Sequence, residues 1–467
     1  MKDLWLALLA SSAIAVSPAG AGGQSCSDRG PAFREIIDEF QSRQRNVGLA
    51  AAVLVEGDLA FAEAFGWADR EAGRRATPET RFGVASITKA FTGLTLLRLA
   101  EGGRIDLDAE IQRYVPEFPR HPEGTVTVRH VAAQLGGIRH WGPERDEALY
   151  ARRFEDVEDI LPLFVEDPFV QAPGVEYSYS SYAYNLLAIA MQRATGERFQ
   201  DLVRASLLDP LALESVAFDA PGFGGDRRAA RYSYYDLTDY HELSEPVRVP
   251  DREYTHNMAG GNMVADIVDL VRLGEAALRP GFLTDAEHRR LWTRPVVDGV
   301  ESPMSFGWFV RPDGNRLAIS GSNPGLQAGM AVWKHEGIVV AVVANSWGIG
   351  SRSAELVDDD HEGLLGRLAA VCAGNRPGAL SEVHAHATSE TVHQDHRGRI
   401  ARVYVHHSTA PKTAASATRT TVLSPLEPPN ISQGGSRKNT AHSRTRIAIP
   451  HRAPMSGALR VAKNHPS

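Results

Sequence analysis

Two residues three positions apart, Ser86 and Lys89, have the types and the spacing of a nucleophile and its base. On a helix, positions i and i+3 share one face, so the hydroxyl and the amine are expected about one turn apart. A serine hydroxyl attacks poorly until a base takes its proton. A lysine is such a base when desolvation or a nearby cation lowers its pKa. The pair therefore predicts nucleophilic catalysis.

The scarcity of lysine supports this interpretation. The chain has six lysines among its 50 Lys and Arg residues, and only Lys89 and Lys334 lie outside the extreme N-terminus and the C-terminal tail. Arginine does not give up its proton in a protein. A lysine at position 89 of an arginine-rich chain therefore indicates a need for an amine that can be deprotonated.

The segments before and after this pair predict the elements that hold it. The segment 82–89 opens an apolar run, so the helix that follows Ser86 is expected to be buried. Upstream, Pro31 begins a helix whose apolar residues recur at helical spacing. Residues 49–55 and 59–65 follow it as two apolar runs around Glu-Gly-Asp, the pattern of a β-hairpin.

The second half of the chain completes the predicted fold. Residues 105 to about 240 are mostly helical in pattern, strands are expected at 316–320, 326–334 and 338–345, and a helix is expected at 359–372. These elements predict an α+β fold. An antiparallel β-sheet is flanked by the N- and C-terminal helices, and a mostly helical lobe is inserted.

The two ends of the chain differ in composition from the middle. Residues 1–25 hold Lys2, a short apolar run and then small residues, the pattern of a cleavable signal peptide that is too short to span a bilayer; a buried N-terminal helix is the alternative. We therefore expect a secreted or periplasmic protein with no stable membrane span after signal removal. The folded domain is predicted at 26–374, and the polar, histidine-rich residues 375–467 are predicted to be a disordered tail.

Charge and cysteine content limit the partners. The net charge is −7 although residues 376–467 carry 13 Lys and Arg against 4 Asp and Glu, so the rest of the chain is strongly acidic, which argues against a nucleic-acid partner. The two cysteines, Cys26 and Cys372, are too few for a thiolate metal cluster or a disulfide-dense scaffold. A single bridge between them is a hypothesis that suits an exported protein.

A tyrosine-rich stretch, residues 176–187, gives the second motif and a family resemblance. With the Ser-x-x-Lys motif, it resembles the serine beta-lactamase and penicillin-binding protein superfamily, specifically its class C-like branch, which carries Tyr-x-Asn before a Leu-Leu helix. Aligned on Leu186 and Leu187, the resemblance places Tyr179 at the catalytic tyrosine and Ser181 where asparagine is usual. Tyr177 and Tyr182 are alternative registers for the tyrosine.

The third motif of this family resembles Ile319-Ser320-Gly321-Ser322. The resemblance implies an oxyanion hole formed by the backbone N–H groups of Ser86 and Ser322, each typically worth about 3 kcal/mol, and substrate contacts from Ser181, Ser320 and Gly321. Ile319 departs from the family, because it stands where lysine or histidine is usual and it can neither donate a hydrogen bond nor carry charge. This departure, together with Ser181 in place of asparagine, favours an uncharged or differently anchored ester, amide or peptide over a β-lactam.

Further stretches are similar to the mitochondrial serine beta-lactamase-like protein and its bacterial relatives. They are residues 114–119, 127–140 and 258–262. For His140, at the end of the second stretch, we expect a surface or core residue, with a position near the cleft as the alternative.

The sequence thus predicts a serine hydrolase that cleaves an ester, amide or peptide bond through an acyl-enzyme on Ser86. Lys89 and Tyr179 relay the proton, no metal or organic cofactor is required, and the partner is a small-molecule or peptide substrate. Two alternatives are a β-lactamase or D-alanyl-D-alanine carboxypeptidase, and a catalytically silent binding or assembly protein. The oligomeric state is left open.

Overall fold

The structure is a computed structural model. It describes residues 25–142, 146–220, 225–238, 241–279, 281–347, 363–373, 389–394 and 400–405. The predicted signal peptide lies outside the described residues apart from Ser25, and so does most of the predicted C-terminal tail. Within that tail, two short segments form an antiparallel pair of strands, β17 (Ser389–Gln394) and β18 (Ile400–Val405).

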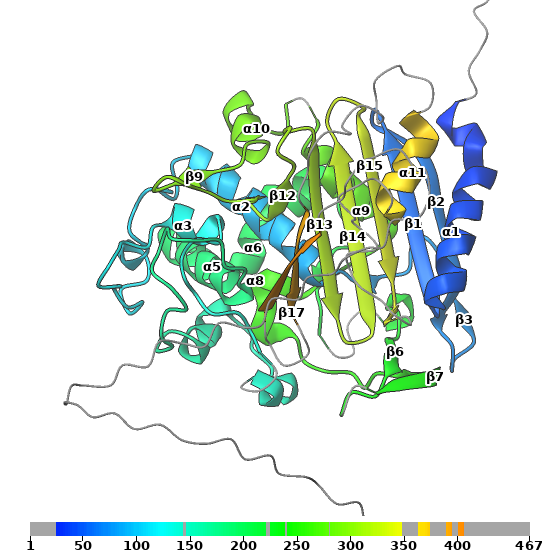
Figure 1. Cartoon of the computed structure of the whole chain (residues 1–467), viewed down its shortest axis with the longest axis horizontal. Helices are drawn as coiled ribbons and strands as arrows, with labels where there is room; N and C mark the ends of the chain where they lie inside the picture. Colours follow the sequence, from blue (N-terminus) through cyan, green and yellow to red (C-terminus); the bar gives the residue numbers. More distant parts are fainter. Residues whose placement is uncertain are drawn as a thin grey trace, which may run out of the picture. The chain divides into compact units, whose positions relative to one another are not determined.

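An eight-stranded antiparallel sheet forms the centre of the fold (Figure 1). Its strand order is β11-β12-β13-β14-β15-β1-β2-β3, so the N-terminal hairpin is joined directly to the last long strand of the domain. The strands are β1 (Gly48–Val55), β2 (Asp58–Asp69), β3 (Arg74–Arg75), β11 (Met304–Ser305), β12 (Trp308–Val310), β13 (Arg316–Asn323), β14 (Leu326–Trp333) and β15 (Ile338–Ala344).

The terminal helices α1 (Gly30–Gln44) and α11 (Leu364–Ala373) lie side by side on one face of this sheet (Figure 1). Phe33, Ile37 and Phe40 of α1 are buried there at the predicted helical spacing. The helix α9 (Ile267–Ala276) packs on β14, β15 and β1. The predicted fold class, a sheet flanked by the N- and C-terminal helices with an inserted helical lobe, is confirmed.

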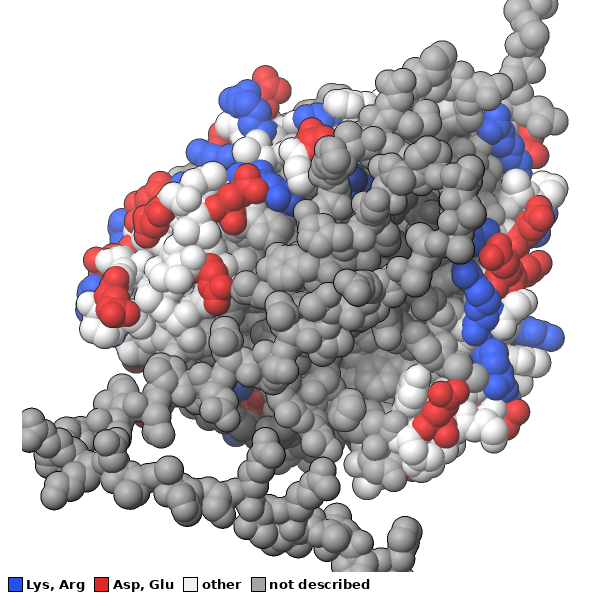
Figure 2. All heavy atoms as spheres, viewed as in Figure 1, with Lys and Arg blue, Asp and Glu red and all other residues white. Residues whose placement is uncertain are grey.

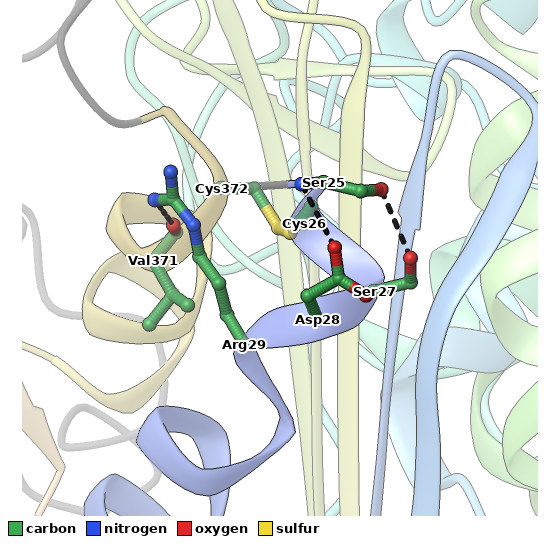
Figure 3. Close-up of a disulfide and its surroundings, with 7 residues drawn as sticks. All are labelled: Ser25, Cys26, Ser27, Asp28, Arg29, Val371 and Cys372. Atoms are coloured by element: carbon green, nitrogen blue, oxygen red, sulfur yellow. Dashed lines mark hydrogen bonds between the residues drawn. A yellow bond between two sulfur atoms is a disulfide. The ribbon is translucent and has the colours of Figure 1, made fainter. Parts of the chain in front are cut away.

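A disulfide joins the two terminal segments on this face. Cys26, in the turn η1 (Cys26–Arg29) before α1, is bonded to Cys372 of α11, with the two Cα atoms 5.1 Å apart (Figure 3). Beside it, Arg29 donates a hydrogen bond from Nη1 to the carbonyl oxygen of Val371 at 2.5 Å. The bridge proposed from the sequence is therefore present in the structure.

The helical lobe packs around two buried helices, α2 (Thr88–Glu101) and α5 (Ser181–Thr195). Both are apolar on most sides, as expected for helices at the centre of a core. The other helical elements of the domain are η2 (Ala85–Ile87), η3 (Ile111–Arg113), α3 (Val128–Ala132), η4 (Glu147–Ala151), η5 (Val157–Leu163), α6 (Phe199–Val203), η6 (Arg204–Leu208), α7 (Asp209–Leu211), η7 (Gly225–Arg227), η8 (Thr255–Asn257), α8 (Met258–Gly261) and α10 (Asp285–Leu291).

Three small sheets lie outside the central sheet, with the orders β4-β8-β5, β16-β6-β7 and β10-β9. Their strands are β4 (Phe82–Gly83), β5 (Ala217–Phe218), β6 (Tyr232–Tyr235), β7 (Glu242–Arg248), β8 (Met263–Ala265), β9 (Val296–Val297), β10 (Val300–Glu301) and β16 (Ser346–Trp347).

The surface of the described residues mixes both signs of charge. Figure 2 shows acidic and basic side chains next to one another on the visible described part of the molecule, and exposed ion pairs such as Arg45–Glu245 and Arg153–Glu155 occur among them. No helix within the described ranges is both long enough and apolar enough to cross a membrane.

Candidate active site

Ser86 lies in the tight turn η2, directly before α2. The preceding residue, Ala85, has a φ of 43°, a left-handed conformation that is unfavourable for a residue with a side chain. Ile87 and Lys89 are fully buried, whereas Ser86 remains partly exposed. The turn thus presents one accessible hydroxyl at the end of a buried helix.

Lys89 contacts Ser86 from within the core. Its Nζ lies 3.3 Å from Ser86 Oγ, 3.0 Å from Ser181 Oγ and 2.5 Å from the carbonyl oxygen of Gly260. Burial lowers the pKa of Lys89 to about 7, because the charged amine loses its hydration. A large share of the amine is therefore neutral at neutral pH, which is the condition that the sequence argument set for a lysine base.

Tyr179 completes the contacts of the nucleophile. Its hydroxyl donates a hydrogen bond to Ser86 Oγ at 2.8 Å, and Lys89 Nζ lies 4.7 Å from the centre of its ring. Removal of the phenol from water raises the pKa of Tyr179 to about 12, so it stays protonated at neutral pH. Tyr182, one alternative register, is instead buried and stacked on Phe164 at 4.9 Å between ring centres.

Strand β13 closes the other side of the nucleophile turn. A Cβ atom on Gly321 would lie 2.4 Å from the Val84 carbonyl oxygen and 2.6 Å from Ser86 N, so only glycine allows this approach. The strand therefore brings Ser322 next to the turn of Ser86, and Trp347 Nε1 donates a hydrogen bond to Ser322 Oγ at 2.8 Å. This position of Ser322 is compatible with the predicted oxyanion hole, which the backbone N–H groups of Ser86 and Ser322 would form.

The remaining predicted residues occupy different environments. Ser181 is buried, and its hydroxyl contacts Lys89. Ser320 is half-buried in β13 between the fully buried Ile319 and Gly321. Contacts of Ser181, Ser320 and Gly321 with a substrate stay predictions. No group of three or more His, Cys, Asp or Glu side chains suited to a metal ion occurs in the part of the chain that the structure describes.

Sequence reasoning missed His140 and the Gly260 carbonyl. Of the two positions considered for His140, the structure shows the one beside the candidate site, because its Nδ1 accepts a hydrogen bond from the backbone N–H of Ser181 at 3.0 Å and its ring centre is 5.4 Å from that of Tyr179. No periodic pattern marks this histidine. The Gly260 contact is made by a backbone atom, which residue types do not reveal.

The family model described as Beta-lactamase matches residues 33–362 of this chain. This range contains every predicted site residue. The chain belongs to the beta-lactamase family. It is 33% identical to esterase EstB of Burkholderia gladioli over 196 residues, which cover 39% of this chain and 50% of the esterase. It is 24% identical to the human mitochondrial serine beta-lactamase-like protein LACTB, with 69% of this chain and 78% of LACTB covered. By class, the chain is therefore a serine hydrolase.

Solved structures of the same fold are similar to this chain. The octameric penicillin-binding protein homologue from Pyrococcus abyssi has a TM-score of 0.62 at 21% identity, covering 75% of this chain and 78% of that protein. The D-amino acid amidase from Ochrobactrum anthropi has a TM-score of 0.61 at 20% identity, with coverages of 73% and 98%. At this identity the likeness establishes the fold.

Proposed function

We propose that this protein hydrolyses an ester or amide bond through an acyl-enzyme formed on Ser86. The observation that carries this proposal is the position of Ser86 Oγ, 2.8 Å from the hydroxyl of Tyr179 and 3.3 Å from Nζ of Lys89. A hydroxyl held between a proton donor and an amine of low pKa has both groups that acyl transfer requires.

In the first half of the reaction, neutral Lys89 takes the proton of Ser86 while Ser86 Oγ bonds to the substrate's carbonyl carbon. The protonated amine then returns that proton through the Tyr179 hydroxyl to the leaving alcohol or amine, and the bond to the leaving group breaks. Tyr179 can relay the proton because its hydroxyl is hydrogen-bonded to Ser86 and stays protonated in its free state.

In the second half, a water molecule replaces the leaving group. It loses a proton to Lys89 as its oxygen bonds to the acyl carbon, and Ser86 recovers a proton as the acid product leaves. The negative oxygen formed in each half is stabilised by the backbone N–H groups of Ser86 and Ser322. One such donor typically changes the rate by about 100- to 1000-fold.

The electrostatics of Lys89 favour a substrate that is uncharged near the scissile bond. Burial is the cause of its low pKa, so a substrate carboxylate bound beside it would raise that pKa and protonate the base. Ile319 supplies no cation to offset such a charge. Two of the similar proteins are named as an esterase and a D-amino acid amidase, which supports ester or amide substrates.

Export from the cytoplasm is the localisation that we propose. The Cys26–Cys372 disulfide supports it, because such bonds persist in oxidising compartments and are rare in reducing ones. The composition of residues 1–25 gives the same expectation.

Covalent labelling tests the proposed function. The intact protein is treated with a fluorophosphonate probe, and the modified peptide is found by mass spectrometry, with Ser86→Ala as the matched control. We expect one label on Ser86, none on Ser86→Ala, and hydrolysis of p-nitrophenyl butyrate by the wild type alone. An unlabelled Ser86 in the folded protein would refute the proposal, and turnover of a chromogenic cephalosporin would indicate a β-lactamase instead.

A further inference from the structure

Two adjacent hydrogen bonds fasten the tyrosine loop to the segment Arg139–His140. Ser180 Oγ donates to the carbonyl oxygen of Arg139 at 2.7 Å, and the next residue, Ser181, donates its backbone N–H to His140 Nδ1 at 3.0 Å. On the other side, the Gln134 side chain bonds both the N–H and the carbonyl oxygen of Ser180, at 2.8 and 2.9 Å. The loop that carries Tyr179 is therefore held from two directions.

The segment that holds the loop is itself anchored. Arg139 Nη1 lies 2.9 Å from Asp146 Oδ2, and Arg139 Nε is paired with Asp167. The guanidinium also lies over the ring of Tyr182, 4.7 Å from its centre. Arg139 has two largely buried carboxylate partners, which hold the backbone of Arg139 in place. The backbone of the next residue, His140, is held with it.

The hydrogen bond from Ser181 defines the state of the imidazole. Since Nδ1 accepts, a neutral ring carries its proton on Nε2. Removal from water, together with the charge of nearby Lys89, lowers the pKa of His140 to about 3. A protonated ring would place a second donor against the Ser181 N–H and break the contact.

These contacts join His140 to both partners of the nucleophile. Ser181 carries the hydroxyl that lies 3.0 Å from Lys89 Nζ, and Tyr179 packs its ring against the edge of His140. We propose that His140 is a positioning residue, which through its Nδ1 acceptor holds Ser181, and with it Lys89 and Tyr179, in the geometry that activates Ser86. This inference rests on the proposed function.

Two substitutions separate the acceptor from the ring. His140→Asn keeps an acceptor oxygen near the place of Nδ1 but has no ring, whereas His140→Phe keeps a ring beside Tyr179 but has no acceptor. With p-nitrophenyl butyrate, we expect His140→Phe to lower kcat about 100-fold with KM changed less than about threefold, as for misplaced catalytic groups. We expect His140→Asn to recover kcat to within about fivefold of the wild type.

Controls establish that the loss is local. His335→Asn, at an exposed position before β15, should leave kcat unchanged, and both His140 variants should unfold at temperatures close to that of the wild type. A wild-type kcat in His140→Phe, an equal loss in both His140 variants, or a loss confined to KM would overturn the inference.

A spectroscopic measurement tests the same contact without activity. In 15N-histidine-labelled protein, the resonances lost on His140→Asn substitution belong to His140. They should report a neutral ring protonated on Nε2 at pH 6, and a protonated ring or the other tautomer would overturn the inference. Failure of the proposed function gives a different result. In that case the fluorophosphonate probe leaves wild-type Ser86 unlabelled, whatever the protonation state of His140.

Discussion

At the scale of single residues, the proposed reaction depends on Lys89, whose surroundings have opposite effects on its pKa. Burial of Lys89 disfavours its charged form, while the Ser181 hydroxyl and the Gly260 carbonyl oxygen are acceptors that favour an ammonium group. Burial prevails and lowers the pKa of Lys89 to about 7. The amine is thus basic enough to take a proton from Ser86 and is not fully protonated at neutral pH.

Replacing Lys89 by arginine tests this function of the amine. Arginine keeps the positive charge but cannot be deprotonated, so we expect Lys89→Arg to lower kcat on p-nitrophenyl butyrate by about 1000-fold, within the range for loss of a general base. Lys334→Arg is the matched control, because it changes the other lysine of the folded domain, remote in sequence from the site. A Lys89→Arg enzyme within tenfold of the wild type would rule out Lys89 as the base.

The sequence predicted the residues whose side-chain type and motif indicate a catalytic function. Ser86 and Lys89 were identified by type and spacing and Tyr179 by the family resemblance, and the structure brings them together. The contact of His140 was not predicted, because it joins a loop to the first residue of α5, 41 positions further along the chain. A histidine without a helical or strand pattern around it gives no sequence signal for such a contact.

At the scale of elements, the proposed oxyanion site depends on the close approach of β13 to η2. The approach needs a residue without a side chain at 321, since a Cβ atom there would lie 2.6 Å from Ser86 N. Ser322 follows immediately and is fixed from the far side by Trp347. The strand therefore determines the position of Ser322, whose N–H group is the second donor that we propose.

Adding one methyl group at this position should separate the two donors. We expect Gly321→Ala to lower kcat about 100-fold, the typical loss for one oxyanion donor, while KM changes less. Gly124→Ala is the matched control, because its Cβ would make ordinary contacts, at 3.5 Å or more. Steady-state kinetics on the same ester measures both variants, and an unchanged kcat in Gly321→Ala would contradict this account of β13.

The long elements were predictable, and most of their ends were predicted closely. The strands expected at 49–55, 326–334 and 338–345 and the helix from Pro31 are present within one or two residues. Strand β13 continues past the predicted end at Ser320 because its pairing with β14 extends to Asn323. The strands of two to four residues outside the central sheet have no periodicity to detect, so their existence depends on tertiary contacts.

At the scale of the whole domain, the two ends of the folded chain are covalently joined. The Cys26–Cys372 bridge spans 346 residues and connects the helices that cover one face of the sheet. Cross-linking positions so far apart restricts the unfolded chain and leaves the folded one unchanged.

Removing the bridge should therefore lower stability and spare chemistry. We expect the double substitution Cys26→Ala with Cys372→Ala to reduce the free energy of unfolding by about 2–5 kcal/mol, with kcat close to that of the wild type. Urea unfolding followed by fluorescence measures the difference, and reduction of the wild type with dithiothreitol should reproduce it. Equal stability of the oxidised and reduced wild type would show that the bridge contributes nothing.

Activation of Ser86 by a neutral Lys89 makes kcat/KM depend on pH, and a pH profile measures this dependence. The pKa of Tyr179 is raised to about 12 and that of His140 is lowered to about 3, so between pH 5 and pH 9 the lysine is the site group that titrates. Its neutral form increases with pH, and we predict that kcat/KM rises through an apparent pKa of about 7 and then levels off. A rate that is constant over this range, or that rises only near the ordinary lysine pKa of about 10.4, would contradict the account.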